Sequence, residues 1–156
     1  MAGRIEARLK ELGIDLPQAA APVAAYVPYT VSGSTLYVSG QVTVWNGERR
    51  FLGKVGQDFT VEQGREAARL CGLNIIAQAK AACGGDLDRV LRVLRLGGFV
   101  NSGPDFHEHP QVINGASELM MEVFGEAGKH ARAAVGAPSL PGNVAVEVDA
   151  VLEIAP

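Results

Sequence analysis

The alternation of side chains near the C-terminus constrains the fold more than any other feature of the sequence. Apolar residues occupy every second position from 144 to 154, namely Val144, Val146, Val148, Ala150, Leu152 and Ile154. Side chains two residues apart share one face of a β-strand, so we expect a strand over about residues 143–154 with that face buried. The other face is mixed, because it carries Glu147 and Asp149 but also Ala145 and Val151. A face that its own helices leave uncovered meets water or another subunit, and Val151 favours the second.

Two longer segments have the pattern of helices that could cover such a sheet. Thr60 and Gln63 form a possible capping box before the first, which Gly84 and Gly85 end. Its apolar positions recur every seven residues, at Val61, Ala68, Ile75 and Ala82. The second predicted helix covers residues 111–128 and carries Val112, Leu119, Met120, Val123 and Phe124.

The remaining β-rich segments complete a single sheet. Residues 29–45 contain two runs around a Ser-Gly-Ser turn, and "RRFLGKV", residues 49–55, predicts a third strand after the Asn-Gly turn signal. A fourth strand is expected over residues 88–100 and a further one over 131–137. The order βββ–α–β–α–ββ predicts an α+β fold with two long helices on one face of the sheet.

The N-terminal segment predicts an addition to this domain. Ile5, Leu9 and Leu12 recur at helical spacing before Gly13. We therefore expect a helical extension over residues 1–15, followed by a single domain over residues 16–156 that begins with a proline-rich extended lead-in.

Composition limits the functions that the chain can perform. Its 156 residues fit one domain, and 47% apolar with 20% charged residues is ordinary globular usage. A net charge of −3 without a basic run gives no surface for nucleic acid, and neither a signal peptide nor a membrane span is apparent. We expect a cytoplasmic protein. Cys71 and Cys83 fall on one predicted helix, about 18 Å apart, so they are expected to be reduced core thiols.

One arginine and one glutamate lie in the otherwise small and apolar stretch "RAAVGAPSLPGNVAVEVDAV". Arg132 has alanine neighbours that leave room for a carboxylate beside its planar guanidinium group. Glu147 could act as a general base or orient water in a partly dehydrated site. For each residue, exposure to solvent on a strand is the ordinary alternative.

Other candidates are weaker. His107 and His109 invite a metal site, but two histidines without a third ligand at suitable spacing give little support to it. Ser39, Gly40 and Gln41 end a predicted strand and could present backbone N–H groups to a ligand. Phosphate-binding, dinucleotide-binding and nucleophile-elbow motifs are absent from the sequence.

These segments together resemble the RidA/YjgF family of reactive intermediate deaminases, also called the L-PSP endoribonuclease family. The resemblance covers about residues 20–155 and is carried by "YVSGQ", the two helices and the C-terminal arginine and glutamate motif. It implies a chorismate-mutase-like fold and a homotrimer whose sheets line a central β-barrel. It also implies ligand clefts between subunits.

The resemblance also implies roles for single residues. Arg132 matches the arginine that holds the substrate carboxylate, and Glu147 matches the glutamate near the attacking water. Tyr26 resembles the tyrosine that closes the pocket, while Ser39 and Gly40 match residues of the cleft wall. The implied reaction is hydrolysis of a 2-imino acid, or its enamine tautomer, to a 2-keto acid and ammonia, with no cofactor.

Two features depart from the family pattern. Ala134 stands where typical deaminases carry cysteine, although a role of the backbone carbonyl there would survive the change. The loop at residues 101–110 is longer than usual and places Pro104 near a position that the family gives to asparagine. A noncatalytic trimeric binder of small carboxylates is therefore the alternative, and a ribonuclease is poorly supported because no basic surface is present.

Overall fold

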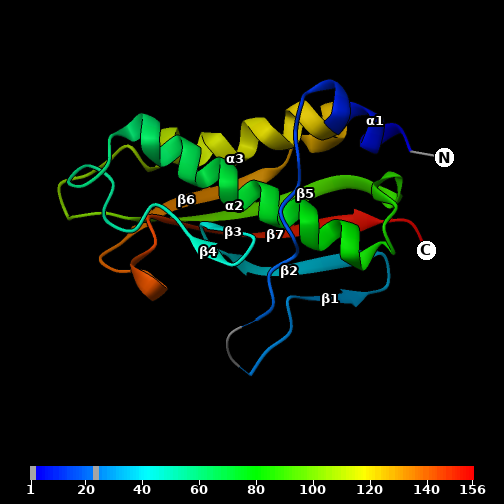
Figure 1. Ribbon diagram of the computed structural model, residues 1–156, viewed down its shortest axis with the longest axis horizontal. Coiled ribbons are helices and arrows are strands. Elements are labelled where there is room, and N and C mark those ends of the chain that lie inside the picture. The colour runs from blue at the N-terminus through cyan, green and yellow to red at the C-terminus, as the bar shows by residue number, and fades with distance from the viewer. Residues whose placement is uncertain (1–2, 23–24) are drawn as a thin grey trace.

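A computed structural model describes residues 3–22 and 25–156 of the chain. Figure 1 shows a main sheet with the helices gathered on one side of it. The helices are α1 (Arg4–Glu11), α2 (Val61–Ala82) and α3 (His109–Phe124). The strands are β1 (Tyr29–Ser32), β2 (Thr35–Gln41), β3 (Val44–Trp45), β4 (Glu48–Arg49), β5 (Val90–Asn101), β6 (Ala131–Ala137) and β7 (Val146–Ile154). Three short 3-10 turns complete the elements, η1 (Leu87–Arg89), η2 (Gly125–Gly128) and η3 (Pro141–Asn143).

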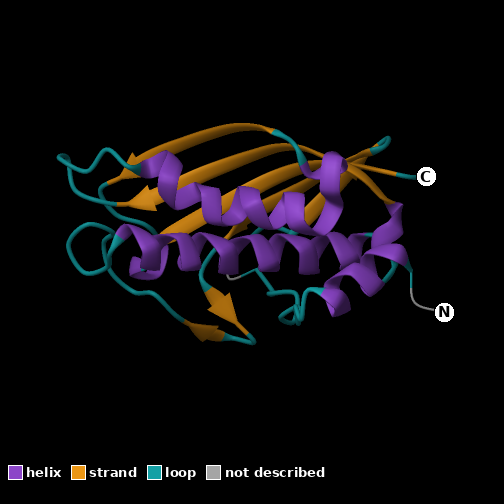
Figure 2. Cartoon of the chain, turned by 90° about the horizontal axis from the view of Figure 1, so that it is seen from above, coloured by secondary structure: helices purple, strands orange, loops and turns teal. Residues whose placement is uncertain are grey.

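The main sheet has five strands in the order β1-β2-β7-β5-β6. β7 is central and antiparallel to both β2 and β5, whereas β6 is an edge strand that runs parallel to β5. Seen from above, α2 and α3 lie side by side across one face of the sheet (Figure 2). The predicted α+β class with two long helices on one face is confirmed.

The alternation in the last strand decides which face of the sheet is covered. Every apolar residue of the set from Val144 to Ile154 is buried beneath the helices. On the opposite face, Tyr37 of β2 and Val135 of β6 are about half exposed, at 48% and 47%. The acidic residues of this face are largely paired, since Asp149 lies 3.6 Å from Arg95 and Glu153 lies 3.7 Å from Arg92.

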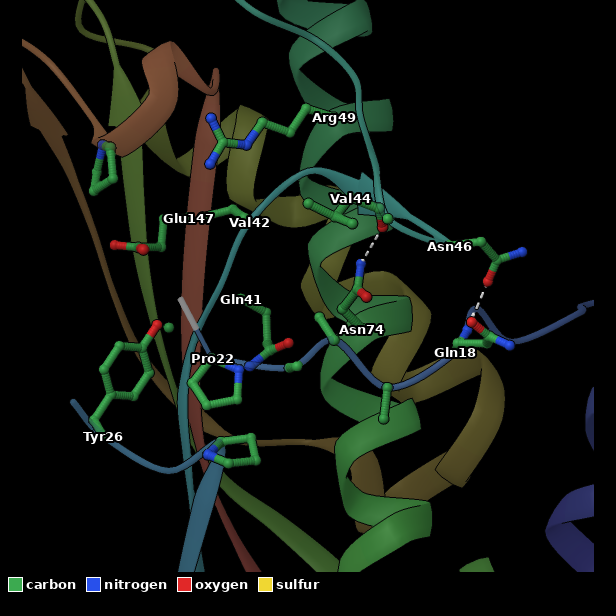
Figure 3. A pocket seen from close by; sticks show the side chains of 17 residues that line it. Gln18, Pro22, Tyr26, Gln41, Val42, Val44, Asn46, Arg49, Asn74 and Glu147 are labelled. Carbon is green, nitrogen blue, oxygen red and sulfur yellow. Dashed lines mark hydrogen bonds between the residues drawn. The ribbon is translucent and has the colours of Figure 1, made fainter. Parts of the chain in front are cut away.

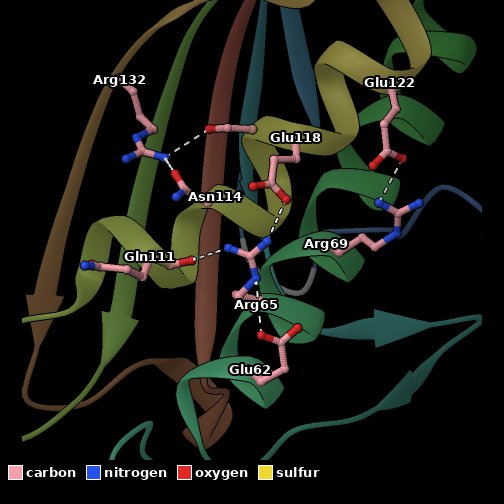
Figure 4. A network of polar contacts seen from close by, with 9 residues as sticks. Glu62, Arg65, Arg69, Gln111, Asn114, Glu118, Glu122 and Arg132 are labelled. Carbon is pink, nitrogen blue, oxygen red and sulfur yellow. Dashed lines mark hydrogen bonds and ion pairs between the residues drawn. The ribbon is translucent and has the colours of Figure 1, made fainter.

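The two long helices are joined by close packing and by charge. The Thr60–Gln63 capping box is present at the start of α2, as predicted. Gly115 of α3 approaches the backbone of α2 so closely that a Cβ atom there would overlap the carbonyl oxygen of Arg65. The Arg65 guanidinium in turn donates to Glu118 of α3 at 2.6 Å (Figure 4).

The N-terminal helix packs onto the core of the same unit. Ile5 and Leu9 are buried in the main hydrophobic cluster. Asp88, in the turn before β5, accepts hydrogen bonds from the backbone N–H groups of Arg4 and Ile5, both at 2.8 Å. The start of the expected extension, residues 1–2, lies outside the described residues, as do residues 23–24 of the lead-in.

The prediction of a strand over residues 49–55 is wrong. Its first residue ends β4, which pairs with β3 in a separate two-stranded ribbon, and Leu52 and Val55 then make only isolated bridges. Phe51 has φ 53° and Gly53 has φ 146°, so the backbone leaves the extended region. The sequence favoured a strand because the segment follows the Asn46-Gly47 turn signal, but that signal does not report the backbone angles beyond the turn.

Two predicted boundaries also change. The second long helix ends at Phe124 and continues as the turn η2, because Gly125 has φ 62°. The last strand begins at Val146 instead of 143, because η3 and the positive φ of Asn143 precede it.

Candidate functional site

A cavity of about 750 Å³ lies beside the bulged end of β2 (Figure 3). Its walls come from the lead-in at residues 18–22, from the end of β2, from the β3–β4 ribbon and from α2. Four residues that the sequence singled out are among those that line it, namely Tyr26, Gly40, Gln41 and Glu147. We refer to it below as the Glu147 cavity.

Glu147 belongs to the central strand β7 and lies on the face that the helices leave uncovered. A Cβ atom at Gly40 would lie 2.9 Å from the Glu147 carboxyl carbon, so the absence of a side chain at position 40 makes room for the carboxylate. The register of β2 against β7 shifts between Val38 and Gln41, which places Ser39 and Gly40 in the irregular part of the strand. The local irregularity of β2 therefore shapes this wall.

The electrostatics of Glu147 differ from those of its neighbours on the strand. Asp149 and Glu153 have arginine partners, whereas no ion pair forms at Glu147 within residues 3–22 and 25–156. Partial burial, and secondly the charge of Asp149, raise the pKa of Glu147 above its ordinary value. A carboxyl group with a raised pKa can exchange protons closer to neutral pH, which suits acid–base chemistry.

Ser39 does not line the cavity but anchors the segment that does. Its hydroxyl donates to the carbonyl of Val27 at 2.7 Å, and its N–H donates to the carbonyl of Pro28 at 2.9 Å. These bonds fix the chain next to Tyr26, whose side chain is 49% exposed at the cavity. Ser39 thus shapes the cavity wall indirectly, by holding the backbone of residues 27 and 28 in place.

Arg132 lies on the edge strand β6, and its side chain is directed toward α3 (Figure 4). Its Nη1 atom donates to Asn114 Oδ1 at 2.7 Å and to Ser117 Oγ at 3.2 Å. The Nε and Nη2 atoms have no hydrogen-bond partner among the residues that the structure describes. We call this side of the guanidinium group the open edge; it has the fork geometry that binds a carboxylate through two parallel hydrogen bonds.

One chain does not bring Arg132 and Glu147 together. Arg132 is the cross-strand partner of Leu96, which is in turn the partner of Ala150, and this row of side chains faces the helices. Glu147 is the cross-strand partner of Phe99, and its side chain lies on the opposite face of the sheet. Strand β5 lies between them in the sheet. Ala134 lies on β6 two residues beyond Arg132, and neither of these residues lines the Glu147 cavity.

The residues around Arg132 were not predicted from the sequence. Asn114 and Ser117 are polar and three residues apart in α3, so they share a face of that helix. This spacing was the available signal, but the partner strand could not be known without the tertiary structure. Likewise, Arg49 and Asn74 line the Glu147 cavity without any local motif that marks them.

Within the residues that the structure describes, His107 and His109 belong to no cluster of potential metal ligands. The described residues contain no group of three or more His, Cys, Asp or Glu side chains that could hold a metal ion. His109 instead opens α3, where its ring packs edge-on against Phe106 with centroids 5.3 Å apart. The structure, in the ranges it describes, has no helix that is long and apolar enough to cross a membrane.

Comparison with known proteins establishes the class to which this fold and these residues belong. Residues 6–154 match the family described as "YjgF/chorismate mutase-like, putative endoribonuclease". The chain therefore belongs to the YjgF/chorismate mutase-like family, as the resemblance at the C-terminus indicated.

Individual relatives extend over nearly the whole chain. Protein TCP17 from Trypanosoma cruzi is 51% identical over 153 residues, which cover 97% of this chain and 95% of that protein. The crystal structure of Atu1372, a protein of unknown function from Agrobacterium tumefaciens, is 54% identical with a TM-score of 0.90, covering 97% of this chain and 92% of the other. RidA from the Antarctic bacterium Psychrobacter is 29% identical with a TM-score of 0.61, covering 88% and 94%.

Proposed function

We propose that this protein hydrolyses reactive 2-imino acids, or their enamine tautomers, to 2-keto acids and ammonia. Family membership together with similarity to a RidA protein supports this activity. The observation that carries the proposal is the presence of two incomplete and complementary half-sites on one chain. Arg132 is a cation with an open edge, and Glu147 is a half-buried carboxylate without a cationic partner in the described part of the chain.

The two half-sites divide the chemistry between them. Arg132 binds the substrate carboxylate and so fixes the position of the neighbouring C=N carbon. Glu147 orients a water molecule whose oxygen bonds to that carbon while its proton passes to the carboxylate. With the imine nitrogen already protonated, the same proton then moves from Glu147 to that nitrogen. The C–N bond breaks as the hydroxyl oxygen forms the keto C=O bond and gives its proton back to Glu147, and ammonia leaves. An imine is already electrophilic, so positioning alone can supply several kcal/mol of the rate enhancement.

The opposite orientation of the two residues requires a second subunit. We propose a homotrimer in which the uncovered sheet faces line a central barrel and Arg132 of one subunit completes the Glu147 cavity of the next. The half-exposed Tyr37 and Val135 on that face would become buried in such an assembly. Tyr26 would close the cleft, and the backbone at Ala134 would line it beside Arg132.

A coupled assay tests the activity directly. An amino-acid dehydratase or oxidase generates 2-iminobutanoate or 2-iminopropanoate in situ, and trapping of the remaining imine with semicarbazide follows its disappearance. We expect the purified protein to accelerate imine loss and the Glu147→Gln variant to be much slower. A parent protein that does not accelerate imine loss would refute the proposed activity.

The same samples distinguish the alternative of a noncatalytic binder. Saturable binding of 2-oxobutanoate by a parent protein that leaves imine loss unchanged would support a binder of small carboxylates.

A further inference from the structure

A serine–histidine pair lies behind Arg132, on the side away from its open edge. Ser117 Oγ is 2.9 Å from His130 Nε2, and His130 Nδ1 is 2.7 Å from the carbonyl oxygen of Gly128. A carbonyl oxygen can only accept, so Nδ1 carries a proton. In the neutral imidazole, Nε2 then accepts and the Ser117 hydroxyl donates to it.

This tautomer determines what Ser117 can offer to Arg132. Since the serine hydrogen is directed to His130, the serine oxygen is free to accept the N–H of Arg132 Nη1. The resulting chain of donors runs from Arg132 through Ser117 and His130 to the carbonyl of Gly128. With Asn114 as the second acceptor, both hydrogens of Nη1 are engaged.

The far end of the chain is held rigidly against α3. A Cβ atom at Gly128 would overlap the carbonyl of Met120, so the turn η2 lies directly on the helix that carries Ser117. Ser117 itself is only 7% exposed. The hydrogen-bond chain is therefore attached to backbone at one end and to a buried helix position in its middle.

We propose that Ser117 and His130 are positioning residues that hold the Arg132 guanidinium with its open edge toward the substrate carboxylate. This inference rests on the proposed function of Arg132. Neither residue touches the substrate. They act by limiting rotation of a flexible side chain, so that less conformational freedom is lost when the carboxylate binds.

The contact between Arg132 and the substrate carboxylate should affect KM more than kcat. The substrate carboxylate does not change charge during imine hydrolysis, so Arg132 holds it equally in the ground and transition states. Loss of such uniform binding raises KM and leaves kcat nearly unchanged. We expect Ser117→Ala and His130→Leu to raise KM, and the Kd for 2-oxobutanoate, by about threefold to tenfold.

Conservative and control variants separate positioning from general damage. His130→Gln retains an amide oxygen that can accept from Ser117, and it should recover most of the affinity for 2-oxobutanoate. His109→Gln is the matched control, because His109 also contacts a serine, with Nε2 3.4 Å from Ser102 Oγ, at the opposite end of α3. It should bind 2-oxobutanoate like the parent.

A double-mutant cycle decides whether the effect passes through Arg132. In an Arg132→Ala background, Ser117→Ala and His130→Leu should cause no further loss of 2-oxobutanoate binding. Additive losses, or single variants that bind like the parent, would overturn the inference. If the parent itself fails to bind 2-oxobutanoate, the proposed function falls first, and this result is distinct from the other two. His130→Leu alters a half-buried position, so the test stands even if Ser117→Ala does not fold.

Discussion

At the scale of single residues, two charged side chains lack the ion-pair partners that their neighbours have. Arg95 and Arg92 neutralise two carboxylates on the uncovered face, whereas the open edge of Arg132 and the carboxylate of Glu147 have no such partner in the described ranges. An unpaired charge in a partly buried position is costly unless a ligand or another subunit completes it.

The first of these side chains is that of Arg132. Arg132→Ala removes both the charge and the planar fork, and charged hydrogen bonds contribute about 1.5–3 kcal/mol, so the affinity for 2-oxobutanoate should fall by roughly tenfold to more than a hundredfold. Arg132→Lys keeps the charge but not the two-point geometry, so its affinity for 2-oxobutanoate should lie between that of the parent and that of Arg132→Ala. Isothermal titration calorimetry measures both. If folded Arg132→Ala binds 2-oxobutanoate as well as the parent does, Arg132 is an ordinary solvent-exposed strand residue with no role in binding.

The second side chain is that of Glu147, whose protonation depends on pH. The raised pKa of Glu147 means that the carboxylate proposed to orient water forms only at higher pH. Turnover should therefore rise with pH over a range that lies above that of an ordinary glutamate. A raised carboxyl pKa also means that the folded state holds the proton more tightly than the unfolded state. The contribution of Glu147 to stability is then present below the unfolded pKa and is lost as pH rises through the folded pKa.

Glu147→Gln should therefore be stabilised relative to the parent at pH 7 but not at pH 4, while its turnover falls and its binding of 2-oxobutanoate stays nearly intact. Urea unfolding at the two pH values measures the first effect. A stability difference that is the same at both values would contradict the shifted pKa.

At the scale of elements, the sequence predicted those features that depend on interactions between residues close together in the chain. The Thr60–Gln63 cap, the buried alternation of β7 and the long helices were predicted because each depends on neighbours in the sequence. The wrongly predicted strand at residues 49–55 shows the limit. Phe51 has a left-handed backbone, and its carbonyl accepts from the N–H of Ala145, a partner that is distant in sequence. The partners of Arg132 in α3 were missed for the same reason, because they are 15 and 18 residues away in sequence.

The contact between the two long helices gives a test at this scale. In a helix interior, Gly→Ala is favoured by about 1 kcal/mol through propensity alone. At Gly115 the added methyl group would instead meet the Arg65 carbonyl, so α2 and α3 must separate. We expect overpacking to prevail and Gly115→Ala to lose about 1–3 kcal/mol in the free energy of unfolding. Met121→Ala, at an exposed position of the same helix, is the control and should change little.

At the scale of the whole molecule, the sheet is covered on one face only. The other face presents half-exposed Tyr37 and Val135 beside paired charges, and the edge strand β6 carries Arg132 away from Glu147 of the same chain. Under the proposed mechanism, a monomer of this kind carries two half-sites and no complete site. Assembly and activity should therefore be inseparable.

Analytical ultracentrifugation measures this assembly. A homotrimer should sediment with a mass near three times that of the 16.4 kDa chain at micromolar concentration. Mixing weakly binding Arg132→Ala with slow Glu147→Gln, after unfolding and joint refolding, should restore part of the activity at low substrate concentration, because some clefts would receive both intact residues. A monomeric parent that retains full deaminase activity would exclude the shared site.

The burial of the two thiols has a practical consequence. Cys71 is fully buried, Cys83 is 2% exposed, and burial raises the pKa of both. Reactive thiolate is thus scarce and shielded, and Ala134 leaves none on the β6 strand beside Arg132. The protein should keep its activity in iodoacetamide or dilute hydrogen peroxide, conditions that inactivate enzymes with an accessible thiolate. The proposed deaminase activity should therefore persist under oxidising conditions.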